Sequence, residues 1–288
     1  RRSRAIGNSI ADGAAAATFE VFNPSTGEVL ATLPDMGAEE TRAAVERAAV
    51  AQTEWAAQTA RERSDTLWRW HQLIVQHTDD LAIILTAEMG KPLAEAKSEV
   101  SHAAAYLQWY AEEANRIYGE TISAPSRDRR MMVIKQPIGV VGAITPWNFP
   151  ASMVARKISP ALAAGCTVVL KPAEQTPLVA GAMFALAEKA GFPEGVVNLI
   201  YASEGDAVGR ELCSHPKVRK ISFTGSTEVG RLLMRQCSDQ VKKLSLELGG
   251  KDPMIVLEDA DIELAANAAV WGAMFNAGQT CVSVERVY

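Results

Sequence analysis

The chain has 288 residues, of which 48% are hydrophobic and 22% charged, a balance typical of a folded protein long enough for two domains. Its 29 Lys and Arg against 34 Asp and Glu give a net charge of -5, which argues against a nucleic-acid partner. No apolar run approaches the roughly 18 residues of a membrane span, so we expect no membrane segment. Four widely spaced cysteines without a C-x-x-C pair predict neither a metal site nor a disulfide framework, and they favour a reducing cytoplasm.

The two ends of the sequence differ in character from the rest. Residues 1–4 are mostly Arg, but Gly7 and Asp12 follow where an export signal needs an apolar core, so we interpret the first residues as a solvated tail. Residues 282–288 alternate apolar and polar side chains like a strand that ends before it pairs. We therefore expect further sequence beyond Tyr288.

The first half of the chain carries mainly helical signals. In residues 38–118, apolar side chains such as Val45 and Ala48 recur with a period near 3.6. Pro92 suits the first turn of a long helical segment that stops at Gly119. This half is predicted to form a helical layer.

The pattern becomes extended from Met131 to Ala143, where β-branched residues, a proline and a glycine predict two short strands around a bend. Beyond this segment short apolar strands alternate with helices, which predicts parallel βαβ units. The expected strands are 166–170, 196–200, 220–223 and 244–248, and the expected helices are 178–190, 206–213 and 227–236. In such sheets ligands bind beyond the carboxyl ends of the strands. The turns of interest therefore follow Ile144, Leu170, Ile200, Phe223 and Leu246.

The turn after Phe223 could hold a phosphate. Gly225 and Ser226 lie between a predicted strand and a predicted helix, where free N–H groups and the helix dipole favour an anion. Gly230 completes a G-x-x-x-x-G spacing, but Arg231 follows it, so the segment is neither a P-loop nor the dinucleotide G-x-G-x-x-G. A purely structural turn explains it equally well.

The turn after Leu170 places Lys171 and Glu174 at the end of a strand, where the two hydroxyls of a ribose could bridge them. A carboxylate there repels a 2′-phosphate and so favours NAD over NADP. A surface lysine beside a first-turn glutamate is the structural alternative.

Cys281 follows the polar, glycine-containing segment NAGQT, an unusual place for a residue that normally fills a core. It is the candidate nucleophile, whereas Cys166, Cys213 and Cys237 have apolar or helical surroundings and are predicted to be packing residues. A thiol nucleophile in a hydrolase needs a histidine base, and none of the four histidines has a neighbourhood that marks it as one.

Glu247 is the candidate base. It lies between apolar neighbours at the end of a strand, where burial would make its carboxylate a better proton acceptor, although a structural salt bridge has equal weight. Asn148 lies in the proline-stiffened turn TPWNFP, and its amide could donate to a developing oxyanion. Capping of the backbone is the common alternative for such an asparagine.

The segments TPWNFP, KPAEQTP, FTGSTEVGR, LELGG and NAGQTC, in this order, resemble the NAD(P)-dependent aldehyde dehydrogenase family from about Phe22 to the end. The resemblance implies an α/β fold, C-terminally incomplete, in which a Rossmann-like parallel sheet precedes a second α/β domain. Residues 1–130 would be the helical part of the cofactor domain, 131–143 an oligomerisation hairpin, 144–249 the NAD-binding domain and 250–288 the start of the catalytic domain. It also implies a homodimer or homotetramer.

The resemblance assigns roles to individual residues. Cys281 would attack the aldehyde carbon, with the oxyanion held by Asn148 and by the backbone N–H of Cys281. Glu247 would activate the water that hydrolyses the thioester, and Lys157 would relay protons. NAD, or alternatively NADP, would be held by Thr145, Pro146, Trp147, Lys171, Glu174, Phe223, Gly225, Ser226, Leu248 and Gly249.

Within the family the segments PDMGAEE, WRWHQLI and VRKISFTGSTEVGR are most similar to the succinate-semialdehyde dehydrogenases. Arg156 matches an arginine that contacts the substrate carboxylate in that subgroup, where a guanidinium can form a bidentate pair. Phe275 replaces a second such arginine, and Ser283 replaces a redox-active cysteine. The substrate could therefore instead be a neutral aliphatic or aromatic aldehyde. A noncatalytic dinucleotide-binding fragment and a cysteine hydrolase are the alternatives from other classes.

Overall fold

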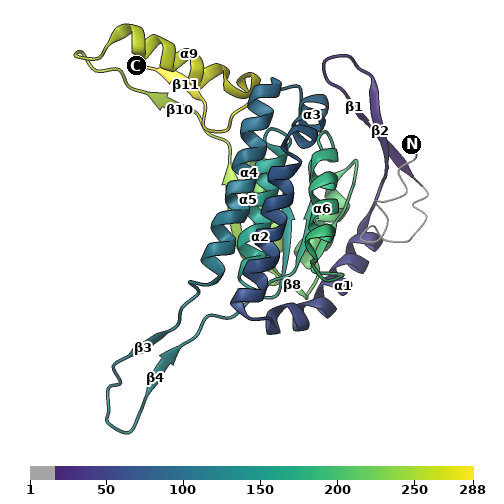
Figure 1. Cartoon of the computed structure of the whole chain (residues 1–288), viewed down its shortest axis with the longest axis vertical. Helices are drawn as coiled ribbons and strands as arrows, with labels where there is room; N and C mark the ends of the chain where they lie inside the picture. Colours follow the sequence, from purple (N-terminus) through teal and green to yellow (C-terminus); the bar gives the residue numbers. More distant parts are fainter. Residues whose placement is uncertain (1–16) are drawn as a thin grey trace.

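Figure 1 shows the computed structural model of the protein. Its central sheet is parallel and has five strands in the order β7-β6-β5-β8-β9. The structure describes residues 17–288, so the expected N-terminal tail lies outside the described residues. The strands are β5 (Val140–Ile144), β6 (Val168–Lys171), β7 (Val197–Leu199), β8 (Val218–Gly225) and β9 (Lys243–Leu248). The predicted α/β fold is confirmed, and the four strands expected beyond Pro146 lie close to their predicted bounds.

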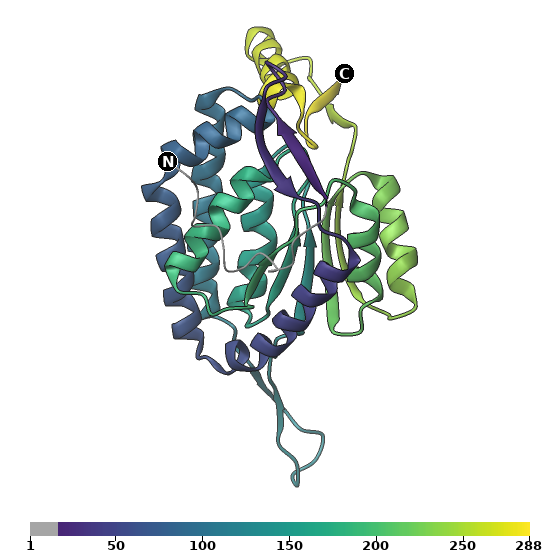
Figure 2. The ribbon, with the colours of Figure 1, turned by 90° about the vertical axis from the view of Figure 1, so that its right-hand side faces the viewer.

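Helices cover both faces of this sheet (Figure 2). The connections between the strands contain α5 (Pro150–Ala163), α6 (Leu178–Ala190), α7 (Gly205–Ser214) and α8 (Thr227–Ser238). Because neither face of the inner strands meets water, β5 and β6 are apolar along almost their whole length instead of alternating. Parallel pairing brings the carboxyl ends of all five strands to one edge of the sheet.

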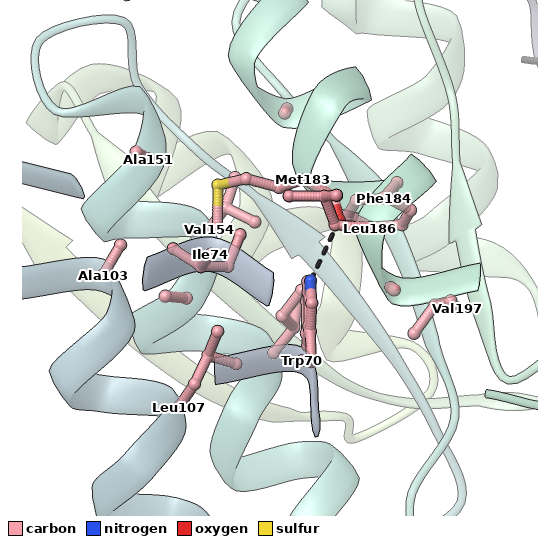
Figure 3. Close-up of a cluster of buried hydrophobic side chains, with 14 of the residues drawn as sticks. Trp70, Ile74, Ala103, Leu107, Ala151, Val154, Met183, Phe184, Leu186 and Val197 are labelled. Atoms are coloured by element: carbon pink, nitrogen blue, oxygen red, sulfur yellow. Dashed lines mark hydrogen bonds between the residues drawn. The ribbon is translucent and has the colours of Figure 1, made fainter. Parts of the chain in front are cut away.

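The helical half consists of α1 (Ala38–Ala57), α2 (Ala60–Gln76), α3 (Thr78–Met89) and α4 (Leu93–Ala114). α2 and α4 pack with α5 and α6 on one face around a core in which the indole of Trp70 donates to the carbonyl of Met183 at 3.0 Å (Figure 3). α1 packs with α7 and the sheet on the other side. None of the described helices is long and apolar enough to cross a bilayer.

Two antiparallel hairpins flank this body. The first, β1 (Thr18–Phe22) with β2 (Val29–Pro34), was not expected from the sequence. The second, β3 (Glu120–Ile122) with β4 (Met131–Val133), extends away from the rest of the chain (Figure 1). The expected arm 131–143 is therefore shifted: the hairpin begins at Glu120, while β5 belongs to the central sheet because its apolar residues pair with β6 and β8.

The residues after Gly250 form a small separate layer of β10 (Asp252–Met254), α9 (Ile262–Gly278) and β11 (Val284–Val287). The expectation of an unpaired terminal strand is wrong, because β11 pairs in parallel with β10, with Asp252 opposite Val284. The last turn of α9 is broken: Phe275, Asn276 and Ala277 have non-helical backbone angles, and φ is positive at Asn276 and Ala277. This break directs the chain toward the sheet edge that carries the candidate site.

Candidate active site

The turns that follow β5, β6, β8 and β9 meet at the carboxyl edge of the sheet. The register places Ile144 opposite Lys171 on one side and Phe223 on the other. Gly225 is opposite Leu248 at the end of β9. The residues predicted to hold a dinucleotide are thus brought together from four separate turns.

The turn between β8 and α8 has the form of a phosphate seat. Ser226 is the N-cap of α8, and its hydroxyl accepts the backbone N–H of Val229 at 3.2 Å. A Cβ atom at Gly225 would lie only 2.5 Å from the ring of Phe223, so the close packing here requires glycine. The free N–H groups of the first turn fit a pyrophosphate.

Lys171 and Glu174 form an ion pair with 2.8 Å between the ammonium and the carboxylate. Gln175 donates to the other carboxylate oxygen at 2.9 Å. Burial raises the pKa of Glu174, but the hydrogen bond and charge of Lys171 outweigh it, so the pKa lies below its ordinary value. Nearby, the hydroxyl of Thr145 is buried without a hydrogen-bond partner among the described residues. This polar edge fits the hydroxyl groups of a nucleotide.

Pro146 and Trp147 continue the turn after Thr145, and the indole of Trp147 is exposed. The hydroxyl of Thr176, in the turn that contains Glu174, donates to the carbonyl of Trp147 at 3.4 Å. The turns after β5 and β6 are thereby joined. Gly249 follows β9, and a Cβ atom there would meet no atom within 4 Å, so space is open beside Leu248.

Cys281 lies in the loop that follows the break in α9. It is half-buried, whereas the other three cysteines are buried, as predicted. The hydroxyl of Thr280 donates to the carbonyl of Phe275 at 3.1 Å, which closes the loop just before the thiol. Asn148 lies against this loop: its side-chain amide donates to the carbonyl of Gln279 at 2.9 Å. The candidate oxyanion donor thus contacts the loop of the candidate nucleophile, although the two are far apart in sequence.

Glu247 faces the same space from β9. Its carboxylate accepts a hydrogen bond from Arg156 at 3.0 Å and one from the hydroxyl of Thr224 at 3.3 Å. The side chain is 41% exposed, so the expected burial is wrong, because β9 is the edge strand and its outer side is uncovered. The structural salt bridge that the sequence left open is present. The hydroxyl of Tyr106 accepts the two remaining guanidinium contacts, at 2.9 and 2.6 Å.

Lys157 follows Arg156 in α5 and is buried. Burial lowers its pKa from 10.5 to about 8, with Glu247 opposing the shift and the charges of Arg156 and Lys220 adding to it. An amine with a pKa near 8 can accept and release protons at ordinary pH. Its position beside Glu247 is compatible with the predicted relay.

Cys281, Glu247 and Arg156 all line one cavity of about 960 Å³. Much of the remaining wall is aromatic, from α4, α9 and Phe149 just before α5. The ring of Phe275 stacks on Phe149 with 6.2 Å between centroids and on Trp271 with 5.1 Å. The cavity therefore combines a thiol, a carboxylate and a guanidinium with an apolar wall, a combination suited to a small carbonyl compound.

Comparisons with known proteins agree with this geometry. The model of the aldehyde dehydrogenase family matches residues 10–288. The chain belongs to that family. It is 78% identical over 270 residues to a probable NADP(+) succinate-semialdehyde dehydrogenase of Sinorhizobium fredii, covering 94% of this chain and 55% of the relative. It is 55% identical over 271 residues to the glutarate-semialdehyde dehydrogenase of Pseudomonas putida, covering 94% of this chain and 56% of the relative.

Among solved structures, betaine aldehyde dehydrogenase from Staphylococcus aureus in complex with NAD+ superposes with a TM-score of 0.93 at 37% identity, covering 96% of this chain and 55% of that chain. The aldehyde dehydrogenase fold is therefore shared. The chain spans about half the length of the curated relatives that it matches.

Several residues in and around this cavity were not expected from the sequence. Tyr106, which holds Arg156, and His102, which lines the cavity, both come from α4. The spacing of these two residues indicates only a helix, so no sequence pattern distinguishes them from the other residues of α4. Lys91 and Glu99, which contact the segment around Asn148, were hidden in the same helical half. In the described part of the chain, no cluster of three His, Cys, Asp or Glu could hold a metal ion.

Proposed function

We propose that the protein with this sequence oxidises an aldehyde to the carboxylic acid with NAD(P)+, using Cys281 as the nucleophile. The observation that carries the proposal is the convergence of Cys281, Glu247 and Arg156 on one cavity, with Glu247 hydrogen-bonded to Thr224 just before the turn that begins α8. Asn148 contacts the nucleophile loop directly at Gln279.

The chemistry follows from these groups. The deprotonated sulfur of Cys281 adds to the aldehyde carbon, and the carbonyl oxygen becomes an oxyanion that the amide of Asn148 and the backbone N–H of Cys281 stabilise. NAD(P)+, when bound, would supply the two-electron oxidation as the acceptor of the hydride from that carbon. The resulting thioester is cleaved by water, whose proton passes to Glu247, with Lys157 as relay. The carboxylic acid leaves and the thiol is restored.

Arg156 supports a substrate whose far end is anionic, such as succinic or a related semialdehyde. The guanidinium of Arg156 lines the cavity, and a substrate carboxylate could pair with it in place of Glu247. The named semialdehyde relatives support the same substrate class. The aromatic wall around Phe275 is the feature that supports a neutral aliphatic or aromatic aldehyde instead.

The proposal also covers the cofactor, the oligomeric state and the cellular location of the protein. The Lys171 and Glu174 pair supports a free ribose, and thus NAD, while the name of the Sinorhizobium relative supports NADP. The exposed β3–β4 hairpin supports a homodimer or homotetramer. The cysteine pattern supports a cytoplasmic location.

The test is the formation of reduced cofactor, followed by absorbance, from NAD+ or NADP+ with succinic semialdehyde and with a neutral aldehyde of equal length. Cys281→Ala is expected to abolish turnover while cofactor binding persists. His102→Ala is the control, since it changes the cavity wall without touching the proposed chemistry. Turnover that survives Cys281→Ala, or binding of cofactor without any oxidation by the parent protein, would contradict the proposal and favour a noncatalytic dinucleotide-binding protein. Loss of an NAD-independent hydrolysis in His102→Ala would favour a cysteine hydrolase.

A further inference from the structure

A buried ion pair lies behind the candidate site and touches neither the cavity nor solvent. Lys91, in the turn between α3 and α4, donates to the carboxylate of Glu99 on α4. The two residues are only 1% and 3% exposed. Removing both charges from water carries a large desolvation cost, which the attraction between them repays only in part. A pair in this position calls for an explanation other than stability.

Burial acts on both partners. It lowers the pKa of Lys91 and raises the pKa of Glu99, and in each case the charge of the other residue opposes the shift. Lys91 and Glu99 therefore depend on each other to stay charged. Glu95, one turn before Glu99 on α4, adds a further carboxylate near the ammonium of Lys91.

Each member of the pair has a second contact, and both contacts fall on one short segment. The ammonium of Lys91 donates to the backbone carbonyl of Asn148 at 3.0 Å and lies 4.3 Å above the ring of Phe149. Glu99 accepts the backbone N–H groups of Ala151 and Ser152 at 2.8 and 3.1 Å, the free donors of the first turn of α5. The pair thus holds residues 148–152 at both ends.

The nucleophile loop holds the same carbonyl from the opposite side. The side-chain amide of Asn276 donates to the carbonyl of Asn148 at 2.9 Å. Asn276 is fully buried, its φ is +59°, and its backbone N–H donates to Glu95 at 2.8 Å. Positive φ is tolerated by asparagine better than by most residues, and here it turns the amide inward. The carbonyl of Asn148 therefore receives two donors from two separate parts of the chain.

We infer that Lys91 and Asn276 are positioning residues for the oxyanion amide: by fixing the backbone carbonyl of Asn148, they set where its side chain points relative to Cys281. Glu99 holds Lys91 and the start of α5 in place. The inference rests on the proposed function. Precise placement matters because a donor acts on the oxyanion only within hydrogen-bond distance, and losing one such donor costs about 10²–10³ in rate. A less precisely placed Asn148 amide should lose part of this effect, so we expect kcat to fall about tenfold or more.

Asn276→Gly is the first test. Glycine accepts the positive φ without strain, so the variant removes the contacts of the amide to the carbonyls of Asn148 and Gln279 and keeps the backbone path. Ala277→Gly is the matched control, because Ala277 has nearly the same φ, +56°, and its side chain carries no polar group. We expect kcat to fall about tenfold in Asn276→Gly and to stay within about twofold in Ala277→Gly, with KM for the cofactor unchanged in both.

The second test removes the ion pair as a unit. Lys91→Met leaves an unpaired buried carboxylate and is expected to lower the melting temperature strongly. The double variant Lys91→Met/Glu99→Met should recover most of that stability, since no isolated charge remains. Its kcat should nevertheless stay low, because the carbonyl of Asn148 has lost its donor. Glu88→Gln is the control: Glu88 is equally buried and caps α6 through Leu178 and Val179, so stability should fall while kcat holds.

The outcomes separate the inference from the proposed function. If the parent protein oxidises aldehydes and Asn276→Gly keeps its full kcat, the positioning role is wrong, whether or not the double variant folds. A loss shared equally by Ala277→Gly would also overturn it, since loop flexibility would then be the cause. If the parent protein oxidises no aldehyde with either cofactor, the proposed function itself fails, and the positioning role fails with it. A selective loss in Asn276→Gly with normal cofactor binding supports it.

Discussion

The roles proposed for Arg156 and Glu247 compete with each other. In the proposed mechanism Glu247 holds the water molecule that cleaves the thioester and Arg156 holds the anionic end of the substrate, yet the two side chains are bonded to one another at 3.0 Å. Both are partly exposed, so the pair itself contributes little stability. A substrate carboxylate that takes the place of Glu247 on Arg156 would release the base at the moment it is needed.

Arg156→Gln tests this competition. For succinic semialdehyde we expect kcat/KM to fall about 100-fold, because a charged bidentate contact worth roughly 3 kcal/mol is lost. For a neutral aldehyde of equal length, kcat should stay constant or rise, since Glu247 is no longer held. Steady-state rates for the two aldehydes with one enzyme preparation give the comparison. An equal loss for both substrates would show that Arg156 supports the fold or the base and does not recognise the carboxylate.

Lys157 predicts a pH dependence of stability. Its pKa falls from 10.5 in the unfolded chain to about 8 in the folded one, so between these values the unfolded state binds more protons and stability rises with pH. At about 1.4 kcal/mol per pKa unit the effect is on the order of 3 kcal/mol. Lys157→Met should remove this dependence. Below pH 8 we expect Lys157→Met to melt at a higher temperature than the parent protein, and we expect this difference to shrink as the pH rises toward 10.5. A difference that is constant over this range would contradict the buried, neutralised amine.

At the level of elements, the turn between β8 and α8 depends on the absence of a side chain at Gly225. A Cβ atom there meets the Phe223 ring at 2.5 and 2.9 Å, and overpacking of this kind costs about 1–3 kcal/mol. We expect Gly225→Ala to weaken NAD(P)+ binding about tenfold, as measured by calorimetric titration, because the phosphate seat is displaced. Gly209→Ala on the neighbouring α7 is the control, since its Cβ would lie 4.0 Å from Leu233. Equal cofactor affinity in the two variants would argue against the seat.

Four strands of the parallel sheet, β6, β7, β8 and β9, could be predicted because each contains several apolar residues between turns, whereas most of β5 was assigned to the expected arm. α6 was predicted at its observed bounds for the same reason. The β1–β2 hairpin was missed, since its side chains are mostly exposed and its signal is weak over a few residues. The break in α9 was also not predicted. The positive φ at Asn276 and Ala277 is stabilised by contacts to Glu95 and Asn148, and these residues lie far away in sequence.

The residues of the candidate site likewise fall into those that the sequence predicted and those that it did not. Motifs gave the residues at the strand ends, where local sequence determines a turn. The ion pair between Arg156 and Glu247 and the link from Asn148 to Gln279 depend on how α5, β9 and the α9 loop pack, so the sequence could name the partners but not their pairing. Lys91 and Glu99 had no signal at all, because an isolated charged residue in a helical region normally faces solvent.

For the whole molecule, the β3–β4 hairpin is the part least explained by the single chain. Its strands lie apart from the core, and apolar side chains along β4 and just after it face solvent. Met132 and Ile134 are 76% and 71% exposed. An isolated two-stranded hairpin is at best marginally stable in water, and clustered apolar exposure marks protein contact sites. A second copy of the chain that covers this surface would explain both features.

Replacing Met132→Lys and Ile134→Lys together should therefore lower the molar mass measured by light scattering toward that of the monomer. Two charges at the centre of an apolar contact would remain without partners, which costs more than the contact gains. Val50→Lys on α1 is the matched control, because Val50 is equally exposed, at 77%, but lies on the body of the molecule. We expect it to leave the mass unchanged. An unaltered mass in the double variant, with the control also unaltered, would contradict the proposal that the hairpin holds two copies of the chain together.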